Sequence, residues 1–225
     1  MPLRERKSEE ERIRNLFSAL RREVRHYKVP VIDLIEVQTG DPYRVLVGTI
    51  LSARTKDETT AAASKRLFEK AKNLDELAKL SVKEIEALIF PVGFYKNKAR
   101  FLKELPKAIR NEFNGEIPKT LEGLMQLPGV GRKTANLVLS VAFKKPAICV
   151  DTHVHRISNR LGLVKTSTPL ETELALRSVL PKRYWKEVNR FFVALGQNIC
   201  SPISPKCSRC PIRKECGRIG VEKSR

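Results

Sequence analysis

Apolar residues recur at helical spacing along most of the chain, and no convincing stretch alternates apolar and polar residues as a half-buried strand would. Signals for helix starts precede several of these stretches. The first is Asp41 followed by Pro42 before "YRVLVGTILSA", a capping residue and then a proline at the first helical position. The pattern predicts an all-α protein with about ten short helices.

Two further starts have the spacing of a capping box, with a Ser or Thr three residues before a Glu. They are Ser81 with Glu84 before "IEALIF", and Thr168 with Glu171 before "LALRSVL". Other stretches of helical periodicity predict helices over residues 16–27, 61–71, 97–113 and 186–200. Pro or Gly interrupts the pattern at predicted linkers over residues 27–42, 114–120 and 144–152.

The chain of 225 residues has a strong excess of basic residues. It contains 44 Lys and Arg but only 25 Asp and Glu, which gives a formal net charge of +19. Such a chain repels itself, and a polyanionic partner is the usual reason for it. A heat-adapted surface is the alternative, but heat adaptation normally adds charges of both signs. The composition therefore favours binding to nucleic acid.

Membrane insertion and secretion find no support in the sequence. No stretch approaches the roughly 18 apolar residues of a membrane span. The N-terminal "MPLRERKSEEER" also lacks the apolar segment of a secretory signal. We expect a cytoplasmic protein that does not associate with membranes.

A glycine-containing turn joins two predicted helices at "TLEGLMQLPGVGRKTAN". We expect Gly129 and Gly131 to permit positive φ and to let another backbone approach closely. The amides of the turn and of the next helix start would then suit a phosphate group. A plain turn between helices, with glycine as a C-cap, is the alternative. The residues predicted to contact DNA here are Leu127, Pro128, Gly129, Val130, Gly131 and Arg132.

Four of the five cysteines are crowded near the end of the chain with the spacing C-x6-C-x2-C-x5-C. Without a secretory signal, clustered thiols indicate a metal or an iron–sulfur site rather than disulfides. Structural zinc sites more often use two close pairs of ligands, so a single close pair favours a larger cluster held by one loop. The predicted ligands are Cys200, Cys207, Cys210 and Cys216. The fifth, Cys149, lies in the apolar "PAICVD" and is expected to be a buried small residue.

The motifs "LPGVGRKTAN" and "VDTHVHR", together with the cysteine spacing, resemble the endonuclease III family of DNA glycosylases. The segments "VLVGTILSARTKD" and "VGFYKNKA" extend the resemblance over nearly the whole chain. It implies a two-domain helix-hairpin-helix glycosylase fold and a [4Fe–4S] cluster. The implied domains are a six-helix barrel over residues 35–145, with its hairpin at about 120–143, and a discontinuous domain of residues 1–34 and 146–225, with its cluster loop at 200–216.

The resemblance also assigns the catalytic lysine to Lys133 and the catalytic aspartate to Asp151. A lysine nucleophile must be neutral, whereas the ordinary pKa of lysine is about 10.4. A helix N-terminus, the neighbouring Arg132 and partial burial would each favour the neutral amine. Asp151 precedes "THVHRISNRLG", so it also has the position of an N-cap, and one residue can serve both purposes.

The implied enzyme is a monomer that removes oxidised pyrimidines from double-stranded DNA and cleaves the strand at the abasic site. In that reaction Lys133 attacks C1′ of a flipped nucleotide, Asp151 assists, and β-elimination follows from a Schiff base. Arg54 stands where bacterial members usually have Gln, and Phe94 stands where Leu is common. Both positions belong to the residues that fill the gap left by the flipped base. His153 is expected to face the substrate pocket, with an exposed histidine on the helix surface as the alternative.

Three other functions compete with this one. A uracil or thymine mismatch glycosylase of the same family is the nearest, but such relatives lack the nucleophilic lysine that Lys133 provides. A DNA-binding module without catalysis is the second, and the pairing of Lys133 with Asp151 argues against it. A redox iron–sulfur protein is the third, and it leaves the basic surface and the hairpin unexplained.

Overall fold

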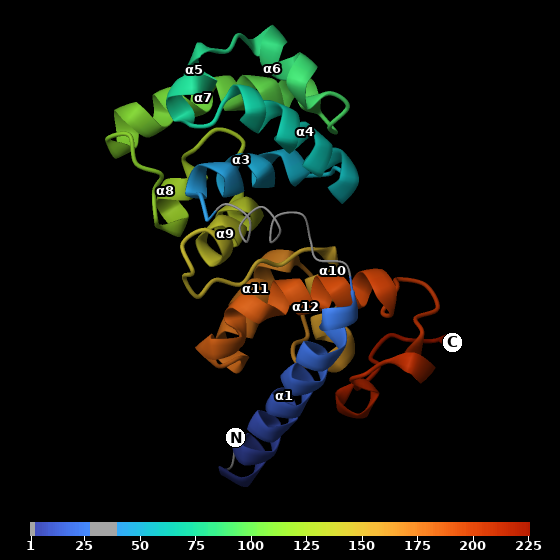
Figure 1. Cartoon of the computed structure of the whole chain (residues 1–225). Coiled ribbons are helices and arrows are strands. Elements are labelled where there is room, and N and C mark those ends of the chain that lie inside the picture. The colour runs from blue at the N-terminus through green and yellow to red at the C-terminus, as the bar shows by residue number, and fades with distance from the viewer. Residues whose placement is uncertain (1–2, 28–39) are drawn as a thin grey trace. The chain divides into compact units, whose positions relative to one another are not determined.

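The computed structural model describes residues 3–27 and 40–225, and this part of the chain contains helices and connecting segments but no strand (Figure 1). The all-α prediction is confirmed. Most of the predicted linker over residues 27–42 lies outside the described residues, as does the predicted domain boundary between residues 34 and 35. None of the described helices has the length and apolar character needed to cross a membrane.

The chain divides into two compact units. One combines the N-terminal residues with Ile148–Arg225, and the described part of the other is residues 40–147. Each unit has a hydrophobic core of its own. The predicted domain ranges, 35–145 against 1–34 with 146–225, remain a prediction.

In the unit of residues 40–147, the helix α3 (Pro42–Ser52) lies in the core and packs against three other helices (Figure 1). Its residues from Val45 to Leu51 are all buried, which explains why its sequence is almost entirely apolar. Asp41 caps it as predicted, its carboxylate accepting from the Tyr43 amide. The helices that contact it are α4 (Asp57–Lys70), α7 (Tyr95–Phe113) and α9 (Arg132–Val141).

Shorter helices complete this unit and pack against the longer ones. Ser81 and Glu84 form the predicted capping box in both directions at the start of α6. The helix α7 continues through Pro106 and buries a stripe of apolar residues. The short helices are α5 (Leu74–Lys79), α6 (Val82–Ile89) and α8 (Leu121–Met125).

In the other unit, α1 (Leu3–Glu23) begins well before the predicted residue 16. Ile13, Leu16, Phe17 and Leu20 are buried at helical spacing, while the charged stretch before them extends the helix. Ion pairs three residues apart, such as Arg12 with Glu9, support that extension. The aromatic ring of Phe17 stacks on Tyr184 with centroids 4.3 Å apart, in the centre of this core.

The remaining elements of this unit are α10 (Thr152–Leu161), α11 (Pro169–Val179), α12 (Trp185–Asn198) and the 3-10 turns η1 (Val24–His26), η2 (Lys182–Tyr184), η3 (Cys207–Arg209) and η4 (Arg213–Glu215). The capping box predicted for α11 is only partly formed. Thr168 accepts from the Glu171 amide, but the Glu171 carboxylate accepts from the amide of Ser167, one residue earlier than expected.

Candidate functional site

The predicted hairpin consists of α8, the turn of residues 126–131 and α9. Thr120 caps α8 by accepting from the Gly123 amide. Leu127 and Val130 are buried in the core, and the Val130 amide donates to the Leu127 carbonyl at 3.1 Å. These contacts hold the turn in place and leave Gly129 and Gly131 exposed.

The two glycines of the turn have different roles. Gly129 has φ +75°, as predicted, and a Cβ there would lie 2.7 Å from the ring of Phe101. Its close neighbour is therefore a side chain of α7 rather than another backbone. The prediction of positive φ is wrong for Gly131, which is extended at φ −90° and ψ 174° with open space around it. Gly131 instead occupies the N-cap position of α9, where it has no side chain to cover the first turn.

Lys133 is the second residue of α9 and follows directly on that uncovered start. Its side chain is exposed, so the partial burial expected to favour its neutral form is not found. Arg132 is half-buried at the first position of the same helix. Both cations therefore lie where the helix dipole is positive, as the sequence predicts.

Asp151 is the N-cap of α10 and is partly buried. Its Oδ1 atom accepts from the amides of His153 at 2.9 Å and Val154 at 2.8 Å. The capping role weighed from the sequence is thus present. Because both bonds go to one oxygen, capping occupies only half of the carboxylate.

His153 is held within its own unit by α12. A Cβ on Gly196 would lie 2.3 Å from His153 Nδ1, so only a glycine leaves room for the imidazole. The guanidinium of Arg156 donates to the same Nδ1 at 3.1 Å, which makes that nitrogen an acceptor. Gly196 and Arg156 therefore fix the ring. The sequence had indicated neither contact, only that His153 would face the substrate pocket or lie exposed on the helix surface.

Arg54 and Phe94 come from two loops of the same unit and meet at its surface. The Arg54 guanidinium lies 4.7 Å from the centroid of the Phe94 ring. Both residues are exposed, and both have left-handed backbone conformations, with φ +55° and +58°. The structure brings these two predicted DNA-contact residues together.

The four clustered cysteines follow α12 and flank the two turns η3 and η4. All four are free thiols and are partly buried. Burial raises the pKa of the Cys210 thiol to about 11, and the nearby Cys200, Cys216 and Cys207 add to the rise. Within residues 3–27 and 40–225, no three His, Cys, Asp or Glu side chains are arranged to hold a metal ion. Cys149 is buried, at 1% exposure, as predicted.

Arginines surround the cysteine loop and fasten it to other helices. Arg160 of α10 donates to Cys200 Sγ at 3.4 Å and to the Ser201 carbonyl at 2.7 Å. Arg12 of α1 donates through Nε to the Glu215 carbonyl at 3.0 Å. These residues were not predicted, because nothing in their local pattern distinguishes them from surface arginines.

Lys98 is a further residue that was not predicted from the sequence. Its ammonium is buried, at 5% exposure, beneath the two loops that carry Arg54 and Phe94. Burial lowers its pKa from 10.5 to about 8. Its burial could have been predicted from helical periodicity, because Lys98 lies on the same face of α7 as the buried Leu102, Leu105 and Ile109.

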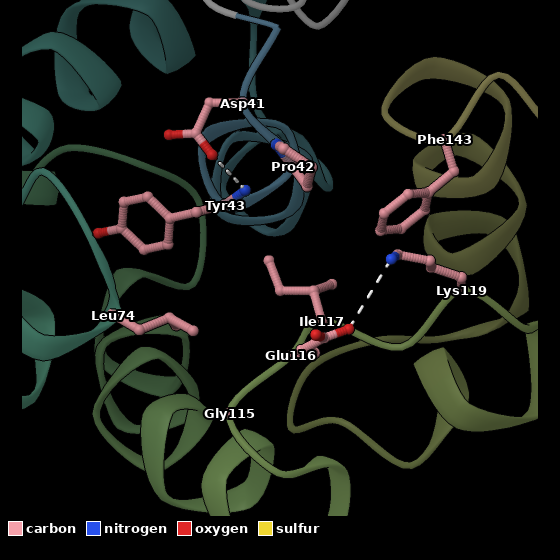
Figure 2. A pocket seen from close by; sticks show the side chains of 9 residues that line it. All are labelled: Asp41, Pro42, Tyr43, Leu74, Gly115, Glu116, Ile117, Lys119 and Phe143. Atoms are coloured by element: carbon pink, nitrogen blue, oxygen red, sulfur yellow. Dashed lines mark hydrogen bonds and ion pairs between the residues drawn. The ribbon is translucent and has the colours of Figure 1, made fainter.

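A pocket of about 330 Å³ lies elsewhere in the unit of residues 40–147 (Figure 2). Figure 2 shows the Glu116–Lys119 ion pair at its edge and the Tyr43 ring to one side. Its lining contains none of the predicted site residues. The lining residues are Asp41, Pro42, Tyr43, Leu74, Gly115, Glu116, Ile117, Lys119 and Phe143.

Comparison with known proteins identifies clear relatives. The family model of the HhH-GPD superfamily base excision DNA repair protein matches residues 47–182. Endonuclease III of Thermotoga maritima is 51% identical over 176 residues, which cover 78% of this chain and 83% of that protein. The chain spans between 47% and 61% of the length of the plant and animal endonuclease III relatives that it matches.

Solved structures agree with these relatives. A trapped endonuclease III–DNA covalent intermediate, an estranged-adenine complex, has a TM-score of 0.73 at 37% identity and covers 82% of this chain and 92% of its own. A thermostable thymine-DNA glycosylase has a TM-score of 0.78 at 26% identity and covers 94% of this chain and 96% of its own.

Proposed function

Since the chain belongs to the endonuclease III family of HhH-GPD base excision DNA repair proteins, we propose that it removes oxidised pyrimidines from double-stranded DNA and then cuts the strand at the abasic site. It is a DNA glycosylase and AP lyase. We propose that it acts as a monomer in the cytoplasm. The observation that carries the proposal for this chain's residues is an exposed lysine in the first turn of α9, directly after the hairpin.

The reaction begins when the neutral Lys133 amine attacks C1′ of a flipped nucleotide. The glycosidic bond breaks, and the base leaves with the bonding electron pair and takes up a proton. Asp151 stabilises the electron-poor sugar and assists the proton transfers, using the carboxylate oxygen that does not cap α10. Flipping costs least for a damaged base, which contributes to selectivity.

The attached Lys133 nitrogen loses a proton, and its lone pair then displaces O4′ from C1′. O4′ takes up a proton as the sugar ring opens, which leaves a protonated Schiff base between Lys133 and C1′. Loss of a proton at C2′ then expels the 3′ phosphate oxygen by β-elimination, which cuts the strand 3′ to the abasic site. Water hydrolyses the imine and regenerates the amine.

The hairpin and Arg132 are proposed to hold a phosphate of the damaged strand. Gly131 leaves the start of α9 uncovered by a side chain, and a helix N-terminus attracts anions. Contacts to phosphate position the protein without reading sequence, as a repair enzyme requires.

The four clustered cysteines are proposed to hold a [4Fe–4S] cluster. Thiolates are the usual ligands of such a cluster, and this loop supplies four free, partly buried cysteines. Three of them lie close enough to the fourth, Cys210, to raise the pKa of its thiol. The bound cluster would brace the loop that carries the exposed Arg209, Arg213 and Lys214. No step of the reaction above passes through it.

Trapping with borohydride tests the central proposal. The protein should form a covalent adduct with abasic-site DNA, because borohydride reduces the Schiff base to a stable amine. Lys133→Ala should abolish the adduct, whereas Lys70→Ala, which removes an exposed lysine at the end of α4, should leave it unchanged. Binding of abasic-site DNA by the wild type with neither trapping nor nicking would contradict the proposal.

Mismatch repair is a second candidate activity, and the similarity to a thermostable thymine-DNA glycosylase favours it. Duplexes that carry one modified base opposite each normal base, together with uracil and thymine opposite guanine, will separate the two activities. Faster release of thymine than of any oxidised pyrimidine would make the mismatch activity the principal one.

Chemical analysis tests the cluster. Protein purified without oxygen should contain about four iron and four sulfide per chain. Zinc at one equivalent, with no sulfide, would show that the cysteines hold a single ion instead.

A further inference from the structure

Two adjacent loops each carry a bulky residue in a conformation that such residues avoid. Arg54 in the α3–α4 loop (residues 53–56) has φ +55°, and Phe94 in the α6–α7 loop (residues 90–94) has φ +58°. A left-handed backbone is rare outside glycine and asparagine, and it persists only where the surrounding structure holds it. Something must therefore stabilise both loops at once.

Lys98 makes the stabilising contacts. Its ammonium donates to the carbonyls of Leu51 at 2.7 Å and Ala53 at 2.6 Å, and to Thr55 Oγ1 at 3.2 Å. An ammonium has three donors, and these three acceptors match them. Because the acceptors lie on both sides of Arg54 in the sequence, the ammonium fixes the path of the backbone through that residue.

The same network reaches the second loop through Thr55 and Gly93. The Gly93 amide donates to Thr55 Oγ1 at 3.2 Å, so one hydroxyl links Lys98 to the residue before Phe94. A Cβ on Gly93 would lie 2.5 Å from the Arg54 carbonyl oxygen. The two loops are thus in direct backbone contact, which only a glycine permits.

The Arg54–Phe94 pair, the stacked side chains of these two residues, remains at the surface. Phe94 is 57% exposed, so its ring contributes little to the core. An aromatic ring and a guanidinium plane are both good stacking partners for nucleic acid bases. The strained loops therefore present a flat, cationic stacking surface instead of packing inward.

We propose that Lys98 is a positioning residue for opening the DNA duplex: its ammonium holds the Arg54–Phe94 pair where it enters the base stack opposite the damaged nucleotide. This inference rests on the proposed function. It adds a buried residue that touches neither the substrate nor the reacting atoms.

The test uses Lys98→Met, which keeps the length of the side chain but removes its donors. Lys103→Met is the matched control, because Lys103 lies on the same helix and donates to two backbone carbonyls, those of Ala78 and Leu80, both at 2.8 Å. Both variants remove a lysine that fastens α7 to a neighbouring segment. Lys98 fastens it to the loop that carries Arg54, whereas Lys103 fastens it to residues 78–80, which carry neither member of the Arg54–Phe94 pair.

The first measurement uses a duplex with a tetrahydrofuran abasic analogue opposite 2-aminopurine, whose fluorescence reports on base stacking. Wild type and Lys103→Met should change the emission on binding, whereas Lys98→Met should leave it near that of free DNA. Thr55→Val, which removes the hydroxyl between the two loops, should have the same effect to a smaller extent. It tests the same network independently, in case Lys98→Met fails to fold.

The second measurement compares borohydride trapping on an intact abasic-site duplex and on one that lacks the nucleotide opposite the site. Lys98→Met should trap about tenfold more slowly on the intact duplex, the loss expected from one weakened stacking contact. It should trap at nearly the wild-type rate on the gapped duplex. Equal behaviour of Lys98→Met and Lys103→Met would overturn this proposal, whereas failure of the wild type to trap on either DNA would overturn the proposed function instead.

Discussion

At the scale of single residues, Asp151 shows how one carboxylate can serve both the fold and the proposed reaction. Oδ1 accepts from two amides at the start of α10, which leaves Oδ2 for the sugar. Asparagine keeps an oxygen in the capping position but carries no negative charge. Substitution therefore separates the two roles.

We expect Asp151→Asn to keep the stability of the wild type but to lose most base removal. Asp151→Ala should lose activity and also about 1 kcal/mol of stability, because the N-cap is gone. Thermal unfolding and single-turnover base release measure the two effects. An active Asp151→Asn would limit Asp151 to a structural role.

Lys98 makes the stability of the chain depend on pH. Burial lowers its pKa from 10.5 in the unfolded chain to about 8 in the folded one. Between these values the unfolded chain binds a proton that the folded chain does not, so a rise in pH favours folding. The gain in the free energy of unfolding that comes from this pKa difference is complete above pH 10.5 and is lost as the pH falls through 8.

We expect the free energy of unfolding of the wild type, relative to Lys98→Met, to increase as the pH rises from about 8 to 10.5. Other titrating groups are common to both proteins and cancel in the difference. Urea unfolding at several pH values measures this quantity. A difference that stays constant over the range would show that Lys98 keeps an ordinary pKa.

At the scale of elements, α7 supports both surface features that the proposed function uses. Lys98 fastens the loop of Arg54, and Phe101, one turn further along, packs against Gly129 of the hairpin. Phe94 is the N-cap of this helix, and its backbone carbonyl accepts from the Lys98 amide. One helix thereby positions the stacking pair and the phosphate-binding turn.

The two hairpin glycines should respond differently to alanine. Gly129→Ala should cost about 1–3 kcal/mol, because it places a side chain at φ +75° and against the Phe101 ring. Gly131→Ala should cost at most about 1 kcal/mol, because its backbone is extended and the space is open, so the loss comes only from alanine being a poorer N-cap than glycine. Denaturant unfolding of both variants measures the contrast, and equal losses would contradict this description of the turn.

At the scale of the whole molecule, the net charge of +19 implies binding driven largely by contacts to phosphate. The logarithm of the binding constant should fall linearly with the logarithm of the salt concentration. Arg132→Ala should make this slope shallower by about one and weaken binding to all sequences alike. Titrations of abasic-analogue DNA at several salt concentrations measure the slope, and an unchanged slope would remove Arg132 from the phosphate contacts.

The sequence by itself determined the helical class, the positions of the hairpin and most caps, the burial of Cys149 and the spacing of the four clustered cysteines. Each of these depends on residues close together in the chain, where periodicity and capping rules apply. The family resemblance came from the same local motifs.

Only the tertiary structure decided how distant segments meet. Lys98 bonds to oxygens 43 to 47 residues away, Phe101 covers Gly129, and Gly196 makes room for His153. A local pattern records which face of a helix is buried but not which loop lies over it. The register of Lys98 therefore placed it on the buried face of α7, but only the fold placed the Arg54 and Phe94 loops above it.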